Sequence, residues 1–221
     1  MYSLGRKFSI MTDLNLEYQV ERIIFDSRIA QKGDLFIPLK GLNYDGEDFC
    51  NDAIDKGAAV LTTRNISGPA PVQKVKDAYK ELLEMCKTKL QELKPTIIFI
   101  TGSYGKTTVK DMLKNILGPS CHASKENENN EFGIPFTILS MPKTCEYLVV
   151  ECGARKPNDF DLISNYLFCD VFILTSIAEN HLTTFGTVEN IINTKMKLKK
   201  CLKDKSNFVD GRSVNKESIL E

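Results

Sequence analysis

The stretch that most constrains the fold is TIIFITGSYGKTTVKDML, residues 96–113, where a β-branched apolar run passes through a glycine turn into a helical pattern. Gly102 and Gly105 permit backbone conformations that other residues rarely adopt, so successive amide groups can converge on one point. That point lies at the positive end of the following helix, which favours an anion. The stretch therefore predicts a phosphate-binding loop between a strand and a helix.

The side chains of this loop suit a nucleoside triphosphate. Lys106 supplies a full positive charge for the β- and γ-phosphates, and the hydroxyl of Thr107 can bind Mg²⁺. Ile100 stands where the longer Walker A spacing requires a glycine. The alternative is a strand–helix turn that merely contains glycine and lysine, but the preceding strand, the paired threonines and the amphipathic helix favour nucleotide binding. The predicted nucleotide-binding residues are Gly102, Ser103, Tyr104, Gly105, Lys106, Thr107 and Thr108.

Strands and helices alternate through the rest of the second half of the chain. Apolar runs predict strands at residues 96–100, 147–151 and 170–175, and helical patterns follow at residues 107–117, 159–167 and 188–202. Near-continuous apolar strands that alternate with helices indicate a mostly parallel sheet covered on both faces. After about Cys201 the sequence becomes polar, and no further strand–helix unit is predicted.

The first half of the chain forms a separate small α/β unit. Residues 47–63 pair a helical stretch, which Gly57 ends, with a short strand at residues 58–61. The segment RNISGPAP at residues 64–71 is predicted to be a linker, and a helix is predicted at residues 72–93, before Pro95. The predicted boundaries are therefore residues 1–65 for the first domain, 66–94 for a linker and helix, and 95–221 for a P-loop-type domain.

Composition excludes several classes of protein. The 29 basic and 29 acidic residues cancel, so bulk charge does not favour nucleic acid or an anionic membrane. No apolar run approaches the roughly 20 residues that span a bilayer, and the N-terminus lacks a signal-peptide pattern, so we expect a cytoplasmic protein. The seven cysteines are odd in number and contain no C-x-x-C pair, which favours reduced thiols; only two histidines are present.

Two further residues lie where parallel strands end, and ligands bind at that edge of an open sheet. Glu151 ends the strand at residues 147–151, and beside the phosphate loop its carboxylate can hold Mg²⁺; a capping or salt-bridged glutamate is the alternative. His181 follows the strand at residues 170–175, and its place favours metal or phosphate binding over a structural role. Lys195, in a lysine-rich helix, is by itself typical of a solvated face.

Several motifs in fixed order resemble the Mur ligase family. They are DSRIAQKGDLFIPLKGLNYDGEDF, ITGSYGKTTVKDML, NENNEFGIPFTIL, YLVVECGAR and TSIAENHLTTFGTVENIINTK. The resemblance runs nearly continuously from Ile23 to Lys195. Within the family, the chain is most similar to the type that adds D-alanyl-D-alanine to a UDP-muramoyl-tripeptide.

The resemblance implies an ATP-dependent amide ligase of peptidoglycan precursor synthesis. Such enzymes phosphorylate a substrate carboxylate with ATP, and an amino acid or dipeptide amine then attacks the acyl phosphate. The resemblance implies that four residues act in the reaction: Lys106, Glu151, His181 and Lys195. It also implies that Mg²⁺ is held by Thr107, Glu151, His181 and Lys195. Lys195 falls where many members carry a carbamylated lysine.

The resemblance also implies the substrate-binding residues and a family-typical architecture. Five residues match the family's region that receives the UDP end of the substrate: Ser27, Arg28, Lys40, Gly41 and Asp45. Three more match its substrate and phosphate cleft: Asn127, Asn129 and Asn130. The family has a third, C-terminal domain, so we expect this chain to represent an N-terminal domain and an incomplete central ATPase domain. A partner chain could supply the remainder.

Four positions depart from the family pattern. Glu47 stands in place of a histidine, Ser176 in place of an asparagine, Asn180 in place of an alanine or aspartate, and Lys197 in place of an acidic residue. Two alternatives to a ligase remain at this stage. One is a short, non-catalytic relative that binds nucleotide as a partner of another protein; the other is a kinase on the same type of sheet.

Overall fold

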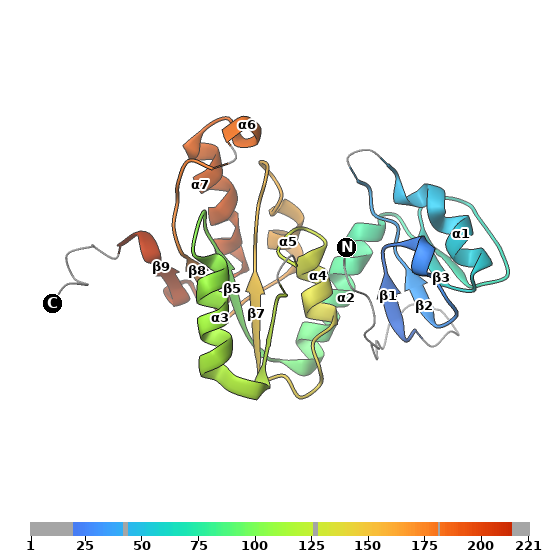
Figure 1. Ribbon diagram of the computed structural model, residues 1–221, viewed down its shortest axis with the longest axis horizontal. Helices are drawn as coiled ribbons and strands as arrows, with labels where there is room; N and C mark the ends of the chain where they lie inside the picture. The colour runs from blue at the N-terminus through green and yellow to red at the C-terminus, as the bar shows by residue number, and fades with distance from the viewer. Residues whose placement is uncertain (1–19, 42–43, 126–127, 181, 214–221) are drawn as a thin grey trace. The chain divides into compact units, whose positions relative to one another are not determined.

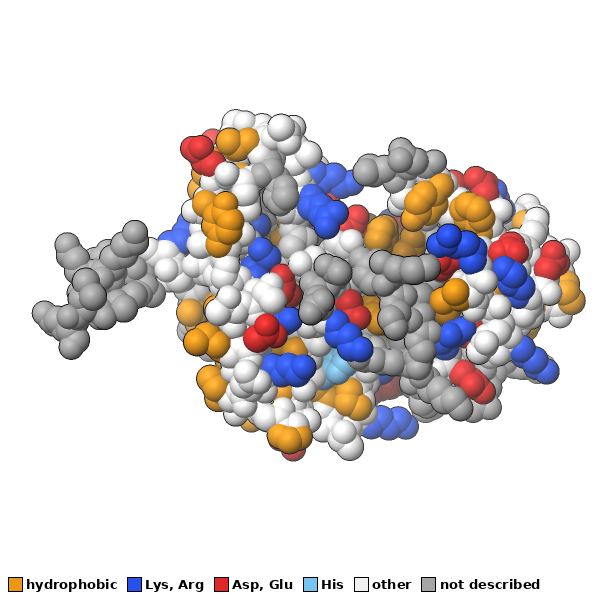
Figure 2. All heavy atoms as spheres, in the orientation of Figure 1, with side chains coloured by type: hydrophobic (Ala, Val, Ile, Leu, Met, Phe, Trp, Pro, Cys, Tyr) orange, Lys and Arg blue, Asp and Glu red, His pale blue; other side chains and the backbone are white. Residues whose placement is uncertain are grey.

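A computed structural model describes residues 20–41, 44–125, 128–180 and 182–213 (Figure 1). The chain divides into two compact units, Met1–Met85 and Cys86–Glu221, and the division falls within helix α2 (Ala78–Leu93). No helix among the described residues is long and apolar enough to cross a membrane. On the face drawn in Figure 2, basic and acidic side chains are interspersed, as the zero net charge leads one to expect.

The first unit is a four-stranded parallel sheet in the order β1-β2-β3-β4. Its strands are β1 (Arg22–Ile24), β2 (Asp34–Phe36), β3 (Ala59–Thr62) and β4 (Val72–Lys74). Helix α1 (Cys50–Asp55) and the 3₁₀ turns η1 (Ser27–Ile29) and η2 (Gly46–Phe49) lie between them. Ile24, Phe36, Ile54 and Val60 pack together in the core, so the apolar runs of the sequence become buried strands.

Two predictions for this unit are wrong. Residues 72–74 form strand β4, because Val72 pairs with Val60 of β3, and helix α2 begins only at Ala78. The Asp77 carboxylate accepts hydrogen bonds from the Tyr79 and Lys80 amides, which starts the helix there. The segment at residues 64–71 therefore connects two paired strands of one sheet and is not a linker between domains.

The second unit is a five-stranded parallel sheet in the order β6-β7-β5-β8-β9. Its strands are β5 (Thr96–Thr101), β6 (Cys121–Ala123), β7 (Tyr147–Glu151), β8 (Val171–Leu174) and β9 (Phe208–Asp210). The helices are α3 (Lys106–Leu117), α4 (Gly133–Leu139), α5 (Asp161–Tyr166), α6 (Leu182–Phe185) and α7 (Val188–Met196). The remaining 3₁₀ turns are η3 (Gly118–Ser120), η4 (Lys197–Cys201), η5 (Lys205–Asn207) and η6 (Gly211–Ser213).

This topology places the phosphate loop at a switch point of the sheet. After β5 the chain passes through α3 to β6 on one side, whereas β8 and β9 lie on the other side of β5 (Figure 1). Ligands of open parallel sheets bind where the chain changes direction in this way, at the carboxyl ends of the strands. The predicted parallel α/β fold is confirmed.

The three strands and three helices predicted in the second unit are present, whereas β6, β9, α4 and α6 were not predicted. The helix predicted at residues 188–202 is α helical only to Met196 and continues as the 3₁₀ turn η4. Strand β9 was not predicted, since its three residues follow a polar stretch and Val209 is half exposed at the edge of the sheet. All seven cysteines are free thiols, as predicted.

Candidate active site

The phosphate loop begins where β5 ends and closes where α3 begins. Gly102 has a φ of 151° and Gly105 a φ of 82°, both outside the range that other residues readily adopt. A Cβ atom on Gly102 would lie 2.0 Å from Oγ1 of Thr175. Glycine is thus required at the first position both for its backbone conformation and for the close approach of the next strand's loop.

Lys106 is the first residue of α3 and bends back over the loop. Its Nζ donates hydrogen bonds to the carbonyl oxygens of Gly102, at 2.9 Å, and Ser103, at 3.3 Å. Burial lowers the pKa of Lys106, and the nearby Glu151 carboxylate opposes that shift. The ammonium therefore lies directly above the turn, where the phosphate loop predicted from the sequence requires it.

Glu151 meets the loop from the end of the neighbouring strand. Pairing of Ile100 with Glu151 places that carboxylate beside the carboxyl end of β5, and its residue is only 2% exposed. One carboxylate oxygen accepts from Oγ1 of Thr107 at 3.0 Å, and the other accepts from Nδ2 of Asn129 at 3.1 Å. Three residues singled out from the sequence, Thr107, Asn129 and Glu151, are therefore in direct contact.

Lys195 reaches the same turn from α7. Its Nζ donates to the Gly102 carbonyl at 3.2 Å, the oxygen that Lys106 also contacts, and the residue is 2% exposed. Burial and the neighbouring Lys106 ammonium lower the pKa of Lys195 to about 8. The solvated face expected from the lysine-rich pattern alone is wrong at this position, because tertiary packing turns Lys195 inward.

Other predicted residues have separate outcomes. Tyr104 and Thr108 are exposed beside the loop. Asn130 accepts from the amides of Phe132 and Gly133, which shapes the turn before α4. His181 and Asn127 lie outside the described residues. Of the four departures from the family pattern, Lys197 forms an ion pair with Asp161 of α5.

The oxygen atoms beside the loop suit Mg²⁺. Thr107 and Glu151 offer a hydroxyl and a carboxylate, the hard ligands that this ion prefers, and Mg²⁺ characteristically combines one or two carboxylates with phosphate oxygens of a substrate. Over the described residues, no three His, Cys, Asp or Glu side chains are grouped so as to hold a metal by themselves. The donor set therefore fits an ion that arrives with a nucleotide.

Polar residues that the sequence did not single out support this arrangement. Oγ of Ser124, at the end of β6, accepts from the Glu151 amide at 3.0 Å. Thr137 of α4 donates to Ser124 or to the Glu128 carboxylate, and all three of these side chains are buried. Glu128 and Thr137 lie within the segment NENNEFGIPFTIL, but that segment by itself does not reveal these contacts, because they depend on α4 packing beside β7.

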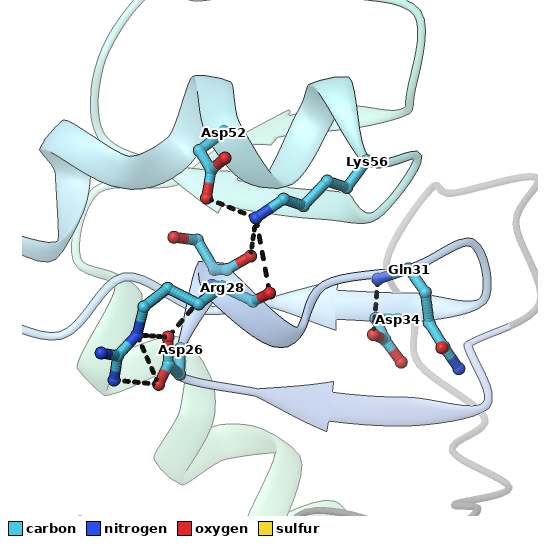
Figure 3. A network of polar contacts seen from close by, with 7 residues as sticks. Asp26, Arg28, Gln31, Asp34, Asp52 and Lys56 are labelled. Atoms are coloured by element: carbon cyan, nitrogen blue, oxygen red, sulfur yellow. Dashed lines mark hydrogen bonds and ion pairs between the residues drawn. The ribbon is translucent and has the colours of Figure 1, made fainter.

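In the first unit, a network of charges holds the Ser27–Arg28 turn, which contains two of the predicted substrate-binding residues (Figure 3). The Asp26 carboxylate accepts from the Arg28 amide at 3.0 Å and pairs with the Arg28 guanidinium at 2.6 Å, which lowers the pKa of Asp26. Lys56, which directly follows α1, donates to the Ser27 carbonyl and to Asp52, each at 2.9 Å. Arg28 is thus held at an exposed position above a turn whose backbone is fixed from α1.

The remaining predicted residues of the first unit lie at another turn. Lys40 and Asp45 form an isolated antiparallel bridge, and the Gly41 amide donates to Tyr44. The Asp45 side chain caps η2 by accepting from the Glu47 amide. Glu47, the first departure from the family pattern, accepts from Thr62 Oγ1 at 2.5 Å and from the Thr63 amide at 2.8 Å, so its carboxylate fastens η2 to the end of β3.

Comparison with known families decides the classification. The Mur ligase middle domain matches residues 100–215, more than half of the chain, and the catalytic domain of the Mur ligase family matches residues 19–88. The chain belongs to the Mur ligase family. The two matched ranges coincide with the parts of this Mur ligase chain that contain the phosphate loop and the Ser27–Arg28 turn.

Individual relatives agree with one another. The UDP-N-acetylmuramoyl-tripeptide–D-alanyl-D-alanine ligase of Bacillus subtilis is 37% identical over 191 residues, which are 84% of this chain and 42% of that enzyme. The enzyme of the same name from Haemophilus influenzae is 31% identical over 185 residues, 80% of this chain and 40% of its own length. This Mur ligase chain therefore spans about two fifths of the length of these curated relatives.

Solved structures of the same family share the fold. The MurF ligase of Thermotoga maritima in complex with ADP aligns with a TM-score of 0.77 and 30% identity, over 90% of this chain and 51% of that one. A MurF structure from Acinetobacter baumannii aligns with a TM-score of 0.78 and 25% identity, over 90% and 48% of the two chains. The fold of this Mur ligase chain is thus that of the corresponding part of MurF.

Proposed function

We propose that this chain provides the nucleotide- and UDP-substrate-binding parts of an ATP-dependent amide ligase of the MurF type. The ligase would activate a UDP-muramoyl-peptide-like carboxylate as an acyl phosphate, for attack by the amine of an amino acid or dipeptide such as D-alanyl-D-alanine. One observation carries the proposal: Lys106, Thr107 and Glu151 converge on the phosphate loop at the switch point of the sheet. The ligase relatives and their ADP complex support it.

The roles of the loop residues follow from their contacts. Lys106 would exchange its carbonyl partners for phosphate oxygens, since an ammonium bonds a phosphate more strongly than a neutral carbonyl. Thr107 and Glu151 would hold Mg²⁺, and that ion would neutralise charge that develops on the transferred phosphoryl group. Asn129 orients the Glu151 carboxylate by donating to Oε1, whereas Thr107 donates to Oε2.

Lys195 is proposed to act as a carbamate, with His181 near the same ions. An amine must be neutral to add CO₂, and a pKa of about 8 keeps a substantial neutral fraction of Lys195 near neutral pH. The carbamate would also remove the repulsion between Lys195 and Lys106. His181 enters this proposal only through its position after β8 in the sequence.

The Ser27–Arg28 turn and the Lys40–Asp45 turn are proposed to receive the UDP end of the substrate. Arg28 offers an exposed guanidinium, suited to diphosphate oxygens, on a backbone that Lys56 holds in place. Glu47 already has two partners inside the unit, so we assign it a role in shaping this site instead of contacting uridine.

Titration of the purified chain with Mg²⁺–ADP and Mg²⁺–ATP tests the nucleotide assignment. Lys106→Ala removes the ammonium that lies over the Gly102 carbonyl, and we expect the dissociation constant to rise at least tenfold. A Lys110→Ala variant on the same helix, tested for retained folding, serves as the matched lysine control. Equal affinity of Lys106→Ala and the parent chain would refute the assignment.

Phosphate release tests the ligase assignment. The assay uses ATP and UDP-muramoyl-tripeptide, with and without D-alanyl-D-alanine, on this chain alone and on this chain fused to the C-terminal half of the Bacillus subtilis relative. We expect release that requires both substrates in the fused protein. Release with the carboxylate substrate but indifferent to the amine would instead favour a kinase, and no response to either substrate would contradict the ligase.

A further inference from the structure

The phosphate loop is fastened sideways to the loop that follows β8. The Ser103 amide donates to the Ser176 carbonyl at 2.9 Å, and the Tyr104 amide donates to Oγ of Ser176 at 2.9 Å. The same Ser176 hydroxyl lies 3.0 Å from the Tyr104 carbonyl and can donate to it. Ser176 alone therefore contacts the Ser103 amide and both the amide and the carbonyl of Tyr104.

Asn180, further along the loop that follows β8, holds the same part of the turn. Ser103 is 6% exposed as a residue, and its hydroxyl donates to Asn180 Oδ1 or to the Ala178 carbonyl, each at 3.2 Å, while it accepts from the Ala178 amide at 3.0 Å. Nδ2 of Asn180 donates to the Ser103 carbonyl at 3.4 Å. The Ser103 side chain thus bonds the β8 loop.

These contacts divide the backbone amides of the loop into two groups. The amides of Ser103 and Tyr104 are bonded to Ser176, whereas those of Lys106, Thr107 and Thr108 belong to the first turn of α3, which has no acceptor within the helix. The second group lies at the positive end of the helix, directly after Gly105, and is oriented for an anion.

We infer that Ser176 and Asn180 are positioning residues, which hold Ser103 and Tyr104 against the β8 loop so that the α3 amides and Lys106 face the phosphates. This inference rests on the proposed nucleotide site and names the parts of the loop that bind phosphate. Both residues are departures from the family pattern, and both contact the loop by side-chain atoms. The phosphate loop of this chain is therefore held by side-chain hydrogen bonds from two residues that differ from the family pattern.

A set of four variants of the full chain tests the inference. Ser176→Ala removes the hydroxyl, Ser176→Thr retains it, and Asn180→Ala removes the amide. Ser120→Ala is the control, because Ser120 precedes β6, away from the phosphate loop, and its hydroxyl donates to the Leu117 carbonyl at 3.4 Å. The backbone bond from Ser103 to Ser176 persists in every variant, so we expect all four to fold, as checked by thermal unfolding.

Two measurements are made on each variant: hydrogen exchange of the Tyr104 amide without nucleotide, by NMR, and the dissociation constant of Mg²⁺–ADP. We expect Ser176→Ala to speed exchange and to weaken ADP about tenfold, the size of the effect of losing two hydrogen bonds. Asn180→Ala is expected to weaken ADP by about threefold to tenfold on the same basis. Ser176→Thr and Ser120→Ala should stay within about twofold of the parent chain.

The outcomes separate this inference from the proposed function. If the parent chain does not bind Mg²⁺–ADP, the proposed function and the positioning role both fail, while exchange of Tyr104 still reports the bond to Ser176. If the parent binds ADP and Ser176→Ala binds it equally well, the positioning role is overturned whatever the exchange rate, and the nucleotide site stands. Faster exchange together with weaker binding, restored by threonine, supports the inference.

Discussion

At the scale of single residues, Lys195 is a cation that folding removes from water. Its side chain is enclosed in the second unit and shares the Gly102 carbonyl with Lys106, so two ammonium groups lie against one oxygen. A buried amine next to a like charge loses its proton more easily, which is why its pKa falls from 10.5 to about 8. The residue therefore opposes folding at neutral pH.

Lys195→Met should change how stability depends on pH. Since the folded pKa is below the unfolded one, the unfolded chain binds more protons between pH 8 and 10.5, and the free energy of unfolding of the parent rises with pH across that window. We expect the variant to be more stable than the parent at pH 7, by up to about 3 kcal/mol, and the difference to shrink toward pH 10. Denaturant unfolding of both chains in CO₂-depleted buffer at pH 7, 8, 9 and 10 measures this difference, and a difference independent of pH would contradict it.

At the scale of elements, a buried ion pair joins the first two strands. Arg22 of β1 and Asp34 of β2 are bonded twice, at 2.6 and 2.7 Å, and their side chains are 16% and 2% exposed. Asp34 also accepts from the Gln31 amide, which shapes the turn into β2 (Figure 3). The hydrogen bond to Asp34 is the main reason that the pKa of Arg22 is raised. The pair thus sets the register of two three-residue strands that have little pairing of their own.

Removing the Asp34 charge should destabilise the first unit. Asp34→Asn removes the charge that is bonded twice to the largely buried Arg22 guanidinium, and we expect a loss of about 2–4 kcal/mol in the free energy of unfolding. Asp52→Asn is the matched control: it breaks the exposed pair with Lys56, which contributes less than about 1 kcal/mol. Thermal or denaturant unfolding distinguishes them, and equal losses for the two variants would show that burial of the first pair is unimportant.

At the scale of the whole molecule, the two units have separate candidate sites. The phosphate loop and its partners lie in the second unit, and the Ser27–Arg28 turn lies in the first. A ligand that binds only the folded form stabilises by mass action. The proposed function therefore predicts that nucleotide and UDP act on different parts of the chain.

Hydrogen exchange of the full chain checks this prediction. Mg²⁺–ADP at 100 times its dissociation constant should stabilise the folded chain by about 2.7 kcal/mol and slow exchange at residues 102–108. UDP should slow exchange at residues 26–30 instead. Protection by ADP confined to the first unit, or protection of the same residues by both ligands, would contradict the assignment of one site to each unit.

Local pattern predicted the central part of the fold and of the candidate site. Long apolar strands and an amphipathic helix can be recognised from the periodicity of their apolar residues. The turn between β5 and α3 can be recognised from its glycines, lysine and threonines, which suit phosphate binding. Strand β4 was predicted as helix because three residues, Val72–Lys74, have no periodicity; pairing with β3 makes them a strand. Strand β9 was missed because its three residues follow a polar stretch and lie at the edge of the sheet.

What local pattern could not supply is which side chains meet. The glycines, Lys106 and Thr107 are adjacent in the chain, so sequence alone placed them together. Glu151 joins them through the pairing of β5 with β7, and Lys195 through the packing of α7, against its own lysine-rich surroundings. Ser176 and Asn180 read as mere departures from a family pattern until the folded chain brought them onto Ser103 and Tyr104. Residues that are neighbours in the chain can be placed together from sequence alone. Contacts between residues more than 70 positions apart form only when the strands of the sheet pair and the helices pack on it.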